Sequence, residues 1–261
     1  MKYGFIGCGN MGGAVARALA QTTQDILVTD RSGKAAALAQ ELGIGYGDNV
    51  TAATTCQRLF LCVKPHMMAD VLKPLQSILQ EKKPLLITMA AGLTIGQIEA
   101  FAGGGLPVVR IMPNTPVAVG SGMIQYCCNH LVTQEMLTDL LSDLRFAGRM
   151  DKLDESLIDA ASALSGSGPA YAYIFMEALA DGAVACGIPR AKALEYAAAT
   201  LEGAAKIYLQ TRTHPGALKD AVCSPGGSTI VGLQALEQHG FRGAVMDCVT
   251  AAYRKNKELG K

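Results

Sequence analysis

The stretch YGFIGCGNMG occupies residues 3–12. Its apolar first half is typical of a buried strand, and apolar residues at helical spacing follow in GGAVARALAQ (12–21). A GxGxxG motif between a strand and a helix is typical of a dinucleotide-binding turn. Gly7 permits the tight turn, Gly9 lets the backbone approach a pyrophosphate, and Gly12 lets helix and strand pack closely. The helix start then offers free N–H groups to phosphate. A glycine turn with only a structural role is the alternative.

The alternation of strand and helix continues along the chain, which is the pattern of βαβ units that build a parallel sheet. Further strands are expected at 25–30, 59–63, 84–90, 107–112 and 122–128, with an edge strand near 149–153. Helices are expected at 32–42, 67–79, 94–102 and 133–148. We therefore predict an α/β fold whose N-terminal, Rossmann-like dinucleotide-binding domain covers residues 1–153.

Beyond this point the sequence changes to Ala-rich segments with helical periodicity and no strand pattern. Helices are expected at 155–164, 168–187, 190–210, 229–240 and 241–259. We predict a second, all-helical domain over residues 154–261. Its two longest Ala- and Gly-rich segments suit close helix contacts on more than one face, and such a layer cannot cover itself. We therefore expect this domain to pack against a second copy of the chain.

The composition excludes several classes of protein. Half of the residues are hydrophobic and 17% are charged, which excludes a disordered chain. The 23 Lys and Arg residues against 22 Asp and Glu residues give a net charge of +1, without a basic block. Neither a nucleic acid nor an anionic membrane is favoured as a partner, and no apolar stretch is long enough to span a bilayer. A small metabolite fits better.

The eight cysteines show neither a CxxC pair nor the spacing of a small secreted domain. They are typical of buried thiols in a reducing compartment, and the N-terminus enters a strand pattern at once, so we expect a cytoplasmic protein. Adjacent Cys127 and Cys128 are more typical of a strand with alternating faces than of a metal pair. No metal site is expected.

The end of the second strand distinguishes the two nicotinamide cofactors. An acidic residue there accepts from the 2′-hydroxyl of NAD, whereas an Arg pairs with the 2′-phosphate of NADP. This chain has both, as Asp30 and Arg31, followed by Ser32. Arg31 and Ser32 could hold a phosphate while Asp30 turns away, or Asp30 could hold the ribose while Arg31 stacks on adenine. A solvated Arg and an N-capping Ser are the structural alternatives, and NADPH is slightly favoured.

Three further loops follow strands at the edge where open α/β sheets bind ligands. They are VKP (63–65), AAG (90–92) and MPNTP (112–116). Small side chains in the second leave room for a nicotinamide ribose, while Lys64 is equally consistent with an ordinary loop lysine. Asn114 and Thr115 could lie near the nicotinamide or cap the turn.

Two motifs in the helical half are candidate substrate elements. SGSGPAY (165–171) is largely explained as a well-capped helix start with Pro in the first turn. CSPGGST (223–229) precedes a helical pattern, and consecutive N–H groups in such a Gly-Gly turn form an anion site. Ser224, Ser228 and Thr229 add hydroxyl groups, which suits a carboxylate with a polar atom beside it. A structural turn is the alternative.

The helical half offers no evident general base. It has no Lys or His near residues 165–175, and His214 has no acidic partner near it in sequence. Oxidation of an alcohol needs a base, whereas reduction of a protonated C=N bond does not, because the iminium already carries its proton. The pattern therefore favours imine reduction, unless folding brings in a base.

Together these motifs resemble the pyrroline-5-carboxylate reductase family over nearly the whole chain. The most specific pair is HPGALKD (214–220) and SPGGST (224–229), placed before a final two-helix tail. The other matching motifs are GFIGCGNMG (4–12), VKP, AAG, MPNTP and SGSGPAY. The resemblance implies reduction of 1-pyrroline-5-carboxylate to L-proline, the last step of proline biosynthesis, by hydride transfer to the C=N carbon. It implies NADPH as cofactor, with NADH as the alternative, and a homodimer or a larger ring such as a decamer.

The resemblance also assigns residues. Ser224 and the backbone N–H groups of Gly227 and Ser228 would hold the substrate carboxylate, and Thr229 would act as the catalytic residue beside the ring nitrogen. The expected cofactor contacts are Ile6, Gly7, Gly9, Asn10, Met11, Gly12, Asp30, Arg31, Ser32, Asn49, Val63, Lys64, Pro65, Ala90, Ala91 and Gly92.

At two positions this chain departs from the residues that are usual in the family. Ser228 stands where Thr or Ala is common, and Asp30 stands where a neutral residue is more typical, which leaves the coenzyme preference open. A β-hydroxyacid-type dehydrogenase would need a Lys on the helix after the glycine turn near residue 166, but the next Lys is Lys192. An NADP-binding redox sensor would bind cofactor without turnover, and it would not need the SPGGST element.

Overall fold

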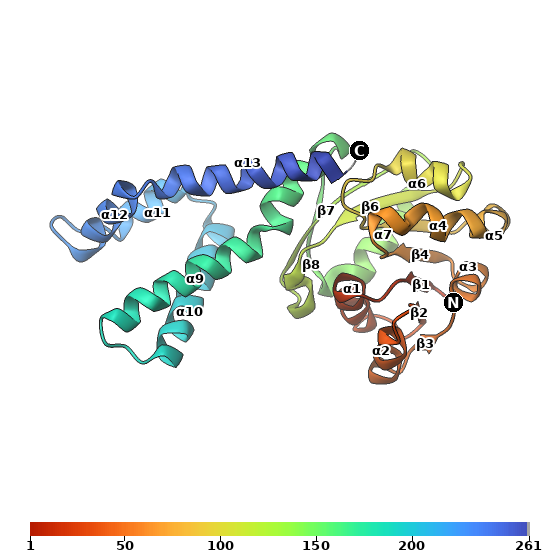
Figure 1. The fold of residues 1–261 in the computed structure, drawn as a ribbon, viewed down its shortest axis with the longest axis horizontal. Helices are drawn as coiled ribbons and strands as arrows, with labels where there is room; N and C mark the ends of the chain where they lie inside the picture. The colour runs from red at the N-terminus through yellow and green to blue at the C-terminus, as the bar shows by residue number, and fades with distance from the viewer. Residues whose placement is uncertain (260–261) are drawn as a thin grey trace. The chain divides into compact units, whose positions relative to one another are not determined.

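A computed structural model describes residues 1–259 and shows one eight-stranded sheet and a group of long helices (Figure 1). The strands lie in the order β3-β2-β1-β4-β5-β6-β7-β8. They are β1 (Tyr3–Ile6), β2 (Ile26–Thr29), β3 (Gly45–Tyr46), β4 (Arg58–Leu61), β5 (Leu85–Thr88), β6 (Val108–Met112), β7 (Gly122–Cys128) and β8 (Gly148–Lys152). Neighbours from β3 to β6 are parallel, β6 and β7 are antiparallel, and β7 and β8 are parallel. The predicted α/β, Rossmann-like fold is confirmed.

The central strands of the sheet are buried throughout, because helices cover both of its faces. One apolar core joins the sheet to α1 (Asn10–Ala20), α2 (Lys34–Leu42) and α7 (Gln134–Asp143). The other joins it to α3 (Asn49–Thr55), α4 (Met68–Leu72), α5 (Gln76–Lys82), α6 (Ile95–Ala102) and α8 (Glu155–Ala161). In β7, Cys127 belongs to the second core and Cys128 packs against the first, as the predicted alternation of faces requires.

Two elements of the first half depart from the expected pattern. The single helix expected at 67–79 is two helices, because Pro74 lies in a 3₁₀ turn, Lys73–Leu75, between α4 and α5. The short pair β3 and α3 was not predicted. Helix α3 reads NVTAATT, a sequence of low helix propensity, and it begins where the side chain of Asp48 accepts from the N–H of Thr51 at 2.7 Å.

The long helices form a second compact unit. Contacts divide the chain into residues 1–167 with the chain from Ala252 on, and residues 168–251. The second unit contains α9 (Gly168–Ala185), α10 (Arg190–Thr211), α11 (Pro215–Ala221), α12 (Ser228–Gln238) and the first part of α13 (Phe241–Leu259). Only α11 was not predicted. The last strand ends at Lys152, so the boundary predicted at residue 153 lies where the chain changes from strands and helices to helices alone. The contacts place the division between the two units later, after residue 167.

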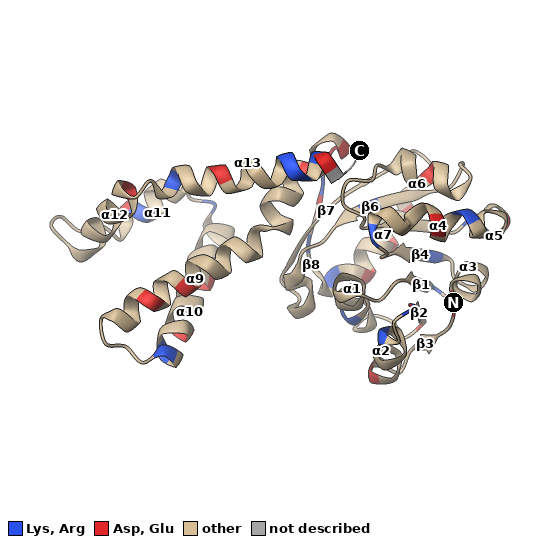
Figure 2. Ribbon diagram, in the orientation of Figure 1, with Lys and Arg blue, Asp and Glu red and all other residues tan. Residues whose placement is uncertain are grey.

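The second unit exposes many large apolar side chains. Figure 2 shows few charged residues along α9, whereas α10 carries five, Arg190, Lys192, Glu195, Glu202 and Lys206. The exposed side chains of these two helices are Tyr173, Ile174, Leu179, Leu194, Tyr196, Ile207 and Tyr208. Those of α12 and α13 are Ile230, Val231, Leu236, Phe241, Val245 and Met246. So many exposed large apolar side chains on one group of helices are typical of a surface that associates with another protein.

A single turn of π-helix, Ser162–Gly166, follows α8 and is held by two side chains from the sheet domain. Asn114 donates from Nδ2 to the carbonyl of Ser165 at 2.9 Å, and its Oδ1 accepts from the N–H of Met123 at 2.9 Å. The hydroxyl of Ser165 donates to Gln125 at 2.9 Å. Asn114 is 7% exposed, and both ends of its amide are used within the fold. Its side chain makes no capping bond in its own turn; it joins the loop after β6 to β7 and to the π-helical turn. Thr115, beside it, is exposed.

Polar side chains also join at the sheet edge opposite the glycine turn. The hydroxyl of Tyr3 donates to Asp143 at 2.6 Å and accepts from Arg58 at 2.8 Å, and Lys2 forms an ion pair with Asp143. Burial acts to raise the pKa of Asp143, but hydrogen bonds from Lys2 and Tyr3 and the charges of Lys2 and Arg58 outweigh it and hold the pKa below its usual value. This cluster joins β1, β4 and the end of α7.

Among residues 1–259, no helix is long and apolar enough to cross a membrane. Within the same residues, no group of His, Cys, Asp and Glu is placed to hold a metal ion.

Replacement of Asp143 by Asn should lower the free energy of unfolding at neutral pH by about 2–3 kcal/mol, because the buried Arg58 and the partly exposed Lys2 both lose this carboxylate. The folded pKa of Asp143 is lowered, so its contribution is present above the unfolded value of about 3.9 and is lost as the pH falls through the folded value. Denaturant unfolding at about pH 7 and about pH 3 measures both effects, with exposed Asp151→Asn as control. An equal difference at the two pH values would contradict this account.

Candidate functional site

The glycine turn after β1 is fixed by close packing. Gly7 has φ +99°, and its N–H donates to the carbonyl of Thr29 at the end of β2, at 2.9 Å. A Cβ on Gly12 would lie 2.5 Å from the carbonyl oxygen of Gly7 and 2.9 Å from Cβ of Cys62. No side chain fits at Gly12, and the conformation of Gly7 is one that L side chains rarely adopt. Both glycines are therefore required by the fold itself.

Gly9 is different, because nothing lies within 4 Å of the place where its Cβ would be. It is the exposed N-cap residue of α1, and no side chain caps the helix. The first N–H groups of α1 are thus open to an anion, and a backbone without a Cβ leaves room for it to approach. Glycine at this position has no packing explanation, whereas a pyrophosphate at the helix N-terminus accounts for it. The residues fit a bound dinucleotide.

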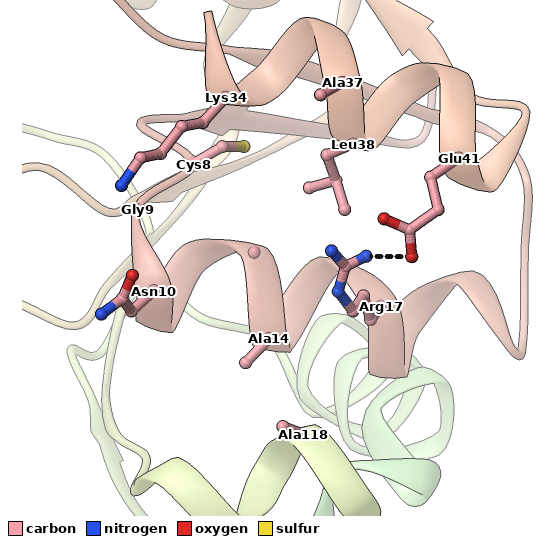
Figure 3. Close-up of a pocket in the computed structure, with 11 residues that line it drawn as sticks. Cys8, Gly9, Asn10, Ala14, Arg17, Lys34, Ala37, Leu38, Glu41 and Ala118 are labelled. Carbon is pink, nitrogen blue, oxygen red and sulfur yellow. Dashed lines mark hydrogen bonds and ion pairs between the residues drawn. The ribbon is translucent and has the colours of Figure 1, made fainter. Parts of the chain in front are cut away.

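A cavity of about 460 Å³ opens beside this turn, between α1 and α2 (Figure 3). Asn10 lies on one side of its mouth, and the side chain of Lys34 extends from the first turn of α2 toward the glycine turn. At the far end, Arg17 and Glu41 form an ion pair of 2.6 Å. Lys34 therefore brings a cation to the cavity, close to the glycine turn. Sequence reasoning missed this residue, although the position of Lys34 directly after DRSG was an available signal.

The turn after β2 is organised by the carboxylate of Asp30. Its Oδ2 accepts from the hydroxyl of Ser32 at 2.7 Å, and its Oδ1 accepts from the N–H of Gly33 at 3.0 Å. Burial acts to raise the pKa of Asp30, but hydrogen bonds from Ser32 and from backbone amides at the start of α2 outweigh it and lower the pKa. Asp30 thus points into its own turn as an anion, while Arg31 and Ser32 are exposed.

Arg31 reaches across the sheet edge to the loop after β4. Its guanidinium lies 3.6 Å from the sulfur of Met67. Strand β1 lies between β2 and β4, so this contact spans the carboxyl end of β1. An adenine bound at the switch between the two halves of the sheet would meet both side chains. Met67 was not predicted, and nothing in its sequence context distinguishes it from a core methionine.

The other expected cofactor residues follow the ends of the same group of strands. Asn49 begins α3, and its Oδ1 accepts from the hydroxyl of Thr29 at 2.6 Å, which leaves its amide N–H groups as donors. After β4, Lys64 is exposed and Pro65 begins a 3₁₀ turn. After β5, Ala90 is buried and Gly92 has φ +77°.

The structure thus gathers the predicted cofactor residues at the carboxyl edge of β2, β1, β4 and β5, where parallel sheets bind ligands. Ile6 differs from the other residues, because its side chain is 1% exposed and lies in the core. Its contribution is to fix the position of the turn that follows it. The individual contacts of these residues with a dinucleotide remain predictions.

The second candidate element lies between α11 and α12. The N–H of Gly227 donates to the carbonyl of Ser224 at 3.0 Å, and a Cβ on Gly227 would lie 2.4 Å from the hydroxyl oxygen of Ser224. Gly226, which precedes it, has φ +70°. Only glycine at both positions lets the chain turn tightly with the Ser224 hydroxyl against the start of α12.

Helix α12 begins at Ser228 without a side-chain cap. Its first N–H groups therefore remain open, and the exposed hydroxyl groups of Ser224, Ser228 and Thr229 are carried on the same turn. None of the Lys and Arg residues of α9–α12 is buried. The element can hold an anion through amides and hydroxyls, as the sequence predicted, with no buried cation.

The helical unit also shows what the candidate base does. Nδ1 of His214 accepts from the N–H of Gly216 at 3.1 Å, so this side chain caps α11. A hydrogen bond from Lys206 lowers the pKa of Glu202, and one to Asp220 raises the pKa of Lys219. Both shifts favour the charged form, so neither group is tuned as a base near neutral pH.

Comparisons with known proteins bear on both units. A family model described as pyrroline-5-carboxylate reductase dimerisation matches residues 155–259, and one described as NADP oxidoreductase coenzyme F420-dependent matches residues 2–92. The first match covers the helices whose apolar side chains are exposed, and the prediction that these helices associate is supported by it. The second covers the glycine turn and the loops after β2, β4 and β5.

The chain is 41% identical to the pyrroline-5-carboxylate reductase of Escherichia coli K12, over 100% of this chain and 98% of that protein. A solved pyrroline carboxylate reductase of Plasmodium falciparum with NADP bound is 32% identical, with a TM-score of 0.89 over 100% of this chain and 98% of its own. A 3-hydroxyisobutyrate dehydrogenase of Mycobacterium tuberculosis is 13% identical, with a TM-score of 0.51 over 69% of this chain and 63% of its own, and this likeness is one of fold alone. The chain belongs to the pyrroline-5-carboxylate reductase family.

Proposed function

We propose that this chain reduces 1-pyrroline-5-carboxylate to L-proline with NADPH or NADH, the last step of proline biosynthesis. The observation that carries the proposal is the uncapped start of α12, where a turn that only glycine can form places amides and three hydroxyl groups together. A carboxylate beside a ring nitrogen matches this set of donors and acceptors. Full-length identity with reductases of this name supports it.

The substrate carboxylate would accept hydrogen bonds from the hydroxyl of Ser224 and from the N–H of Ser228. The N–H of Gly227, the third expected donor, is given to the carbonyl of Ser224 at 3.0 Å in this structure, so it would have to be shared with the substrate. Amide donors and the positive end of the α12 dipole stabilise an anion without a cationic side chain. The missing cation has a chemical advantage, because the reacting iminium nitrogen is itself positive. A Lys or Arg beside it would oppose the protonated form that accepts hydride.

Thr229, on the first turn of α12, would accept a hydrogen bond from the protonated ring nitrogen through Oγ1. Bound NADPH or NADH supplies a hydride, which adds to the C=N carbon. The electron pair of the C=N bond then goes to the nitrogen, which already holds its proton, so the step needs no side chain to give or take one. The chain contributes by positioning and by keeping the nitrogen protonated. This agrees with His214 acting as a helix cap.

The cofactor would lie across the carboxyl edge of the sheet, with its pyrophosphate at Gly9 and the start of α1 and its adenosine beside Arg31 and Met67. NADPH is the cofactor we expect, with NADH as the alternative. The solved relative with NADP bound supports a nicotinamide dinucleotide at this edge.

The helical unit would form a homodimer, and the dimers would assemble into a larger ring such as a decamer. The exposed apolar side chains of α9, α10, α12 and α13 support the first step. We expect the enzyme to act in the cytoplasm, since all eight cysteines are free thiols, as a reducing compartment maintains them.

Purified protein mixed with 1-pyrroline-5-carboxylate and either NADPH or NADH should oxidise the cofactor only when the imine is present. Absorbance at 340 nm follows the reaction, and proline formation is measured separately. Cofactor binding without any turnover would contradict the reductase function and favour a dinucleotide sensor.

Replacement of Thr229 by Ala should lower kcat/KM for the imine by about 10- to 100-fold, because the nitrogen loses its hydrogen-bond partner in the transition state. Ser228→Ala is the matched control, since the backbone of Ser228 is the expected donor, and it should change kcat/KM by less than about threefold. Steady-state kinetics compares the two. Equal effects would remove Thr229 from the reacting centre.

Replacement of Gly227 by Ala should raise KM for the imine by about tenfold or more, because the new Cβ would displace the hydroxyl of Ser224 from its place 2.4 Å away. Cofactor affinity should stay unchanged, since the change lies in the helical unit. Gly232→Ala, a glycine within α12 with open space around its Cβ position, is the control. A normal KM for Gly227→Ala would show that this turn does not hold the substrate.

A further inference from the structure

The turn between β2 and α2 already contains an anion of its own. Asp30 accepts hydrogen bonds from the hydroxyl of Ser32 at 2.7 Å and from the N–H of Gly33 at 3.0 Å. Backbone N–H groups at the start of α2 and the Ser32 hydroxyl keep this carboxylate ionised at neutral pH, since they lower its pKa. A ligand that approaches the end of β2 therefore meets a negative charge that is already hydrogen-bonded.

A 2′-phosphate on the adenosine would need the same donors. A phosphate near neutral pH carries almost two negative charges and accepts hydrogen bonds only. The hydroxyl of Ser32 has a single proton, and in this structure that proton is given to Asp30. The N–H of Gly33 is also taken by Asp30. The side chains of Arg31 and Lys34, both exposed, are the remaining donors on this turn that face no such competition from Asp30.

A 2′-hydroxyl makes the opposite demand, because it can donate to a carboxylate. The two oxygens of Asp30 have about four acceptor sites. Ser32 and Gly33 bond to one oxygen each, and the backbone N–H groups of Lys34 and Ala35 also act on the carboxylate, so a ribose hydroxyl would share it with the amides at the start of α2. The same carboxylate that repels a phosphate can therefore accept from the ribose of NADH. The adenosine end of the cofactor site thus contains groups suited to both cofactors, and Asp30 opposes one of them.

We propose that Asp30 sets the coenzyme preference of this chain by withholding the Ser32 hydroxyl and the Gly33 amide from a 2′-phosphate. The enzyme uses NADH as well as NADPH, and it binds NADPH less tightly than the same site would with a neutral residue at position 30. This inference rests on the proposed function, because it assumes a nicotinamide dinucleotide at the edge of the sheet.

The substitution Asp30→Asn removes the negative charge of the side chain and releases the hydroxyl proton of Ser32, while the side chain keeps its size and shape. Oδ1 of Asn can still accept from the N–H of Gly33, so the turn keeps its cap. The amide nitrogen takes the place of Oδ2 and donates to the oxygen of Ser32 instead of accepting from it. The hydroxyl proton of Ser32 is then free to point at a phosphate, and the negative charge is gone.

Calorimetric titration of NAD⁺ and NADP⁺ tests the proposal on the full-length protein. Asp30→Asn should tighten NADP⁺ binding relative to NAD⁺ by about fivefold or more, because a charge next to the phosphate is removed and one donor is regained. Asp30→Ser, which can also cap the turn, should act in the same direction and guards against a folding defect of the first variant. Glu135→Gln removes one negative charge from the exposed first turn of α7 and should leave the ratio unchanged.

Ser32→Ala gives a second, independent readout. In the unchanged protein it should weaken NADP⁺ binding by less than about twofold, because the hydroxyl proton is already used. Combined with Asp30→Asn it should remove much of the gained affinity for NADP⁺ while leaving NAD⁺ alone. Non-additivity of the two changes is the signature of the shared proton, and purely additive effects would show that Ser32 and Asp30 act separately.

The outcomes distinguish this inference from the proposed function. If NAD⁺ and NADP⁺ both bind and Asp30→Asn leaves their ratio unchanged or lowers it, the inference is overturned and the reductase function is untouched. If neither dinucleotide binds to the unchanged protein, the proposed function fails, and the inference falls with it.

Discussion

The close approach of α1 to β1 and β4 is the constraint on which the sheet domain depends. At Gly12 the helix comes so near that a Cβ would meet the carbonyl oxygen of Gly7 and the side chain of Cys62. This contact fixes where α1 begins, and with it the direction of its free amides. The hydrogen bond from Gly7 to Thr29 then ties the same turn to β2. Three parallel strands consequently end at one place, which is why the loops after them can share a ligand.

The two edges of this sheet use their polar groups differently. At the amino edge, Tyr3, Arg58 and Asp143 bind one another, and the cluster is buried. At the carboxyl edge, Gly9 leaves helix amides open, and Arg31 and Lys64 are exposed. Buried polar groups that are satisfied stabilise a fold, whereas unsatisfied donors at a helix start are available to a ligand. The difference follows from which loops carry glycine and which carry paired charges.

Periodicity predicted the layers of the sheet domain and the long helices of the second unit, because each long element has one dominant pattern. It missed β3 and α3, which are short and owe their position to Asp48 and to pairing with β2. The glycines of both candidate sites could be found from sequence motifs. A positive φ explains Gly7 and Gly226, close packing explains Gly12 and Gly227, and Gly9 is marked by the GxGxxG spacing alone. The direction in which a polar side chain bonds could not be found in this way: Asn114 holds Ser165, and Asp30 holds Ser32, through contacts that depend on folded geometry. Met67 was missed because only the meeting of the loops after β2 and β4 places it near Arg31, whereas the position of Lys34 directly after DRSG was a signal that was not used.

The proposed substrate site and the proposed association of the helical unit depend on the same helices. Helices α9 and α10 bury only Ala180, Ala193 and Ala197 among their own residues, and α11 and α12 bury none. A layer with so little core is not stable by itself, because buried apolar area is what offsets the entropy lost on folding. In the proposed site, the turn from Ser224 to Gly227 would hold the carboxylate between α11 and α12. Association of the exposed apolar faces would add the buried area that this layer lacks and so hold the turn in place, and on this proposal loss of the dimer would weaken substrate binding.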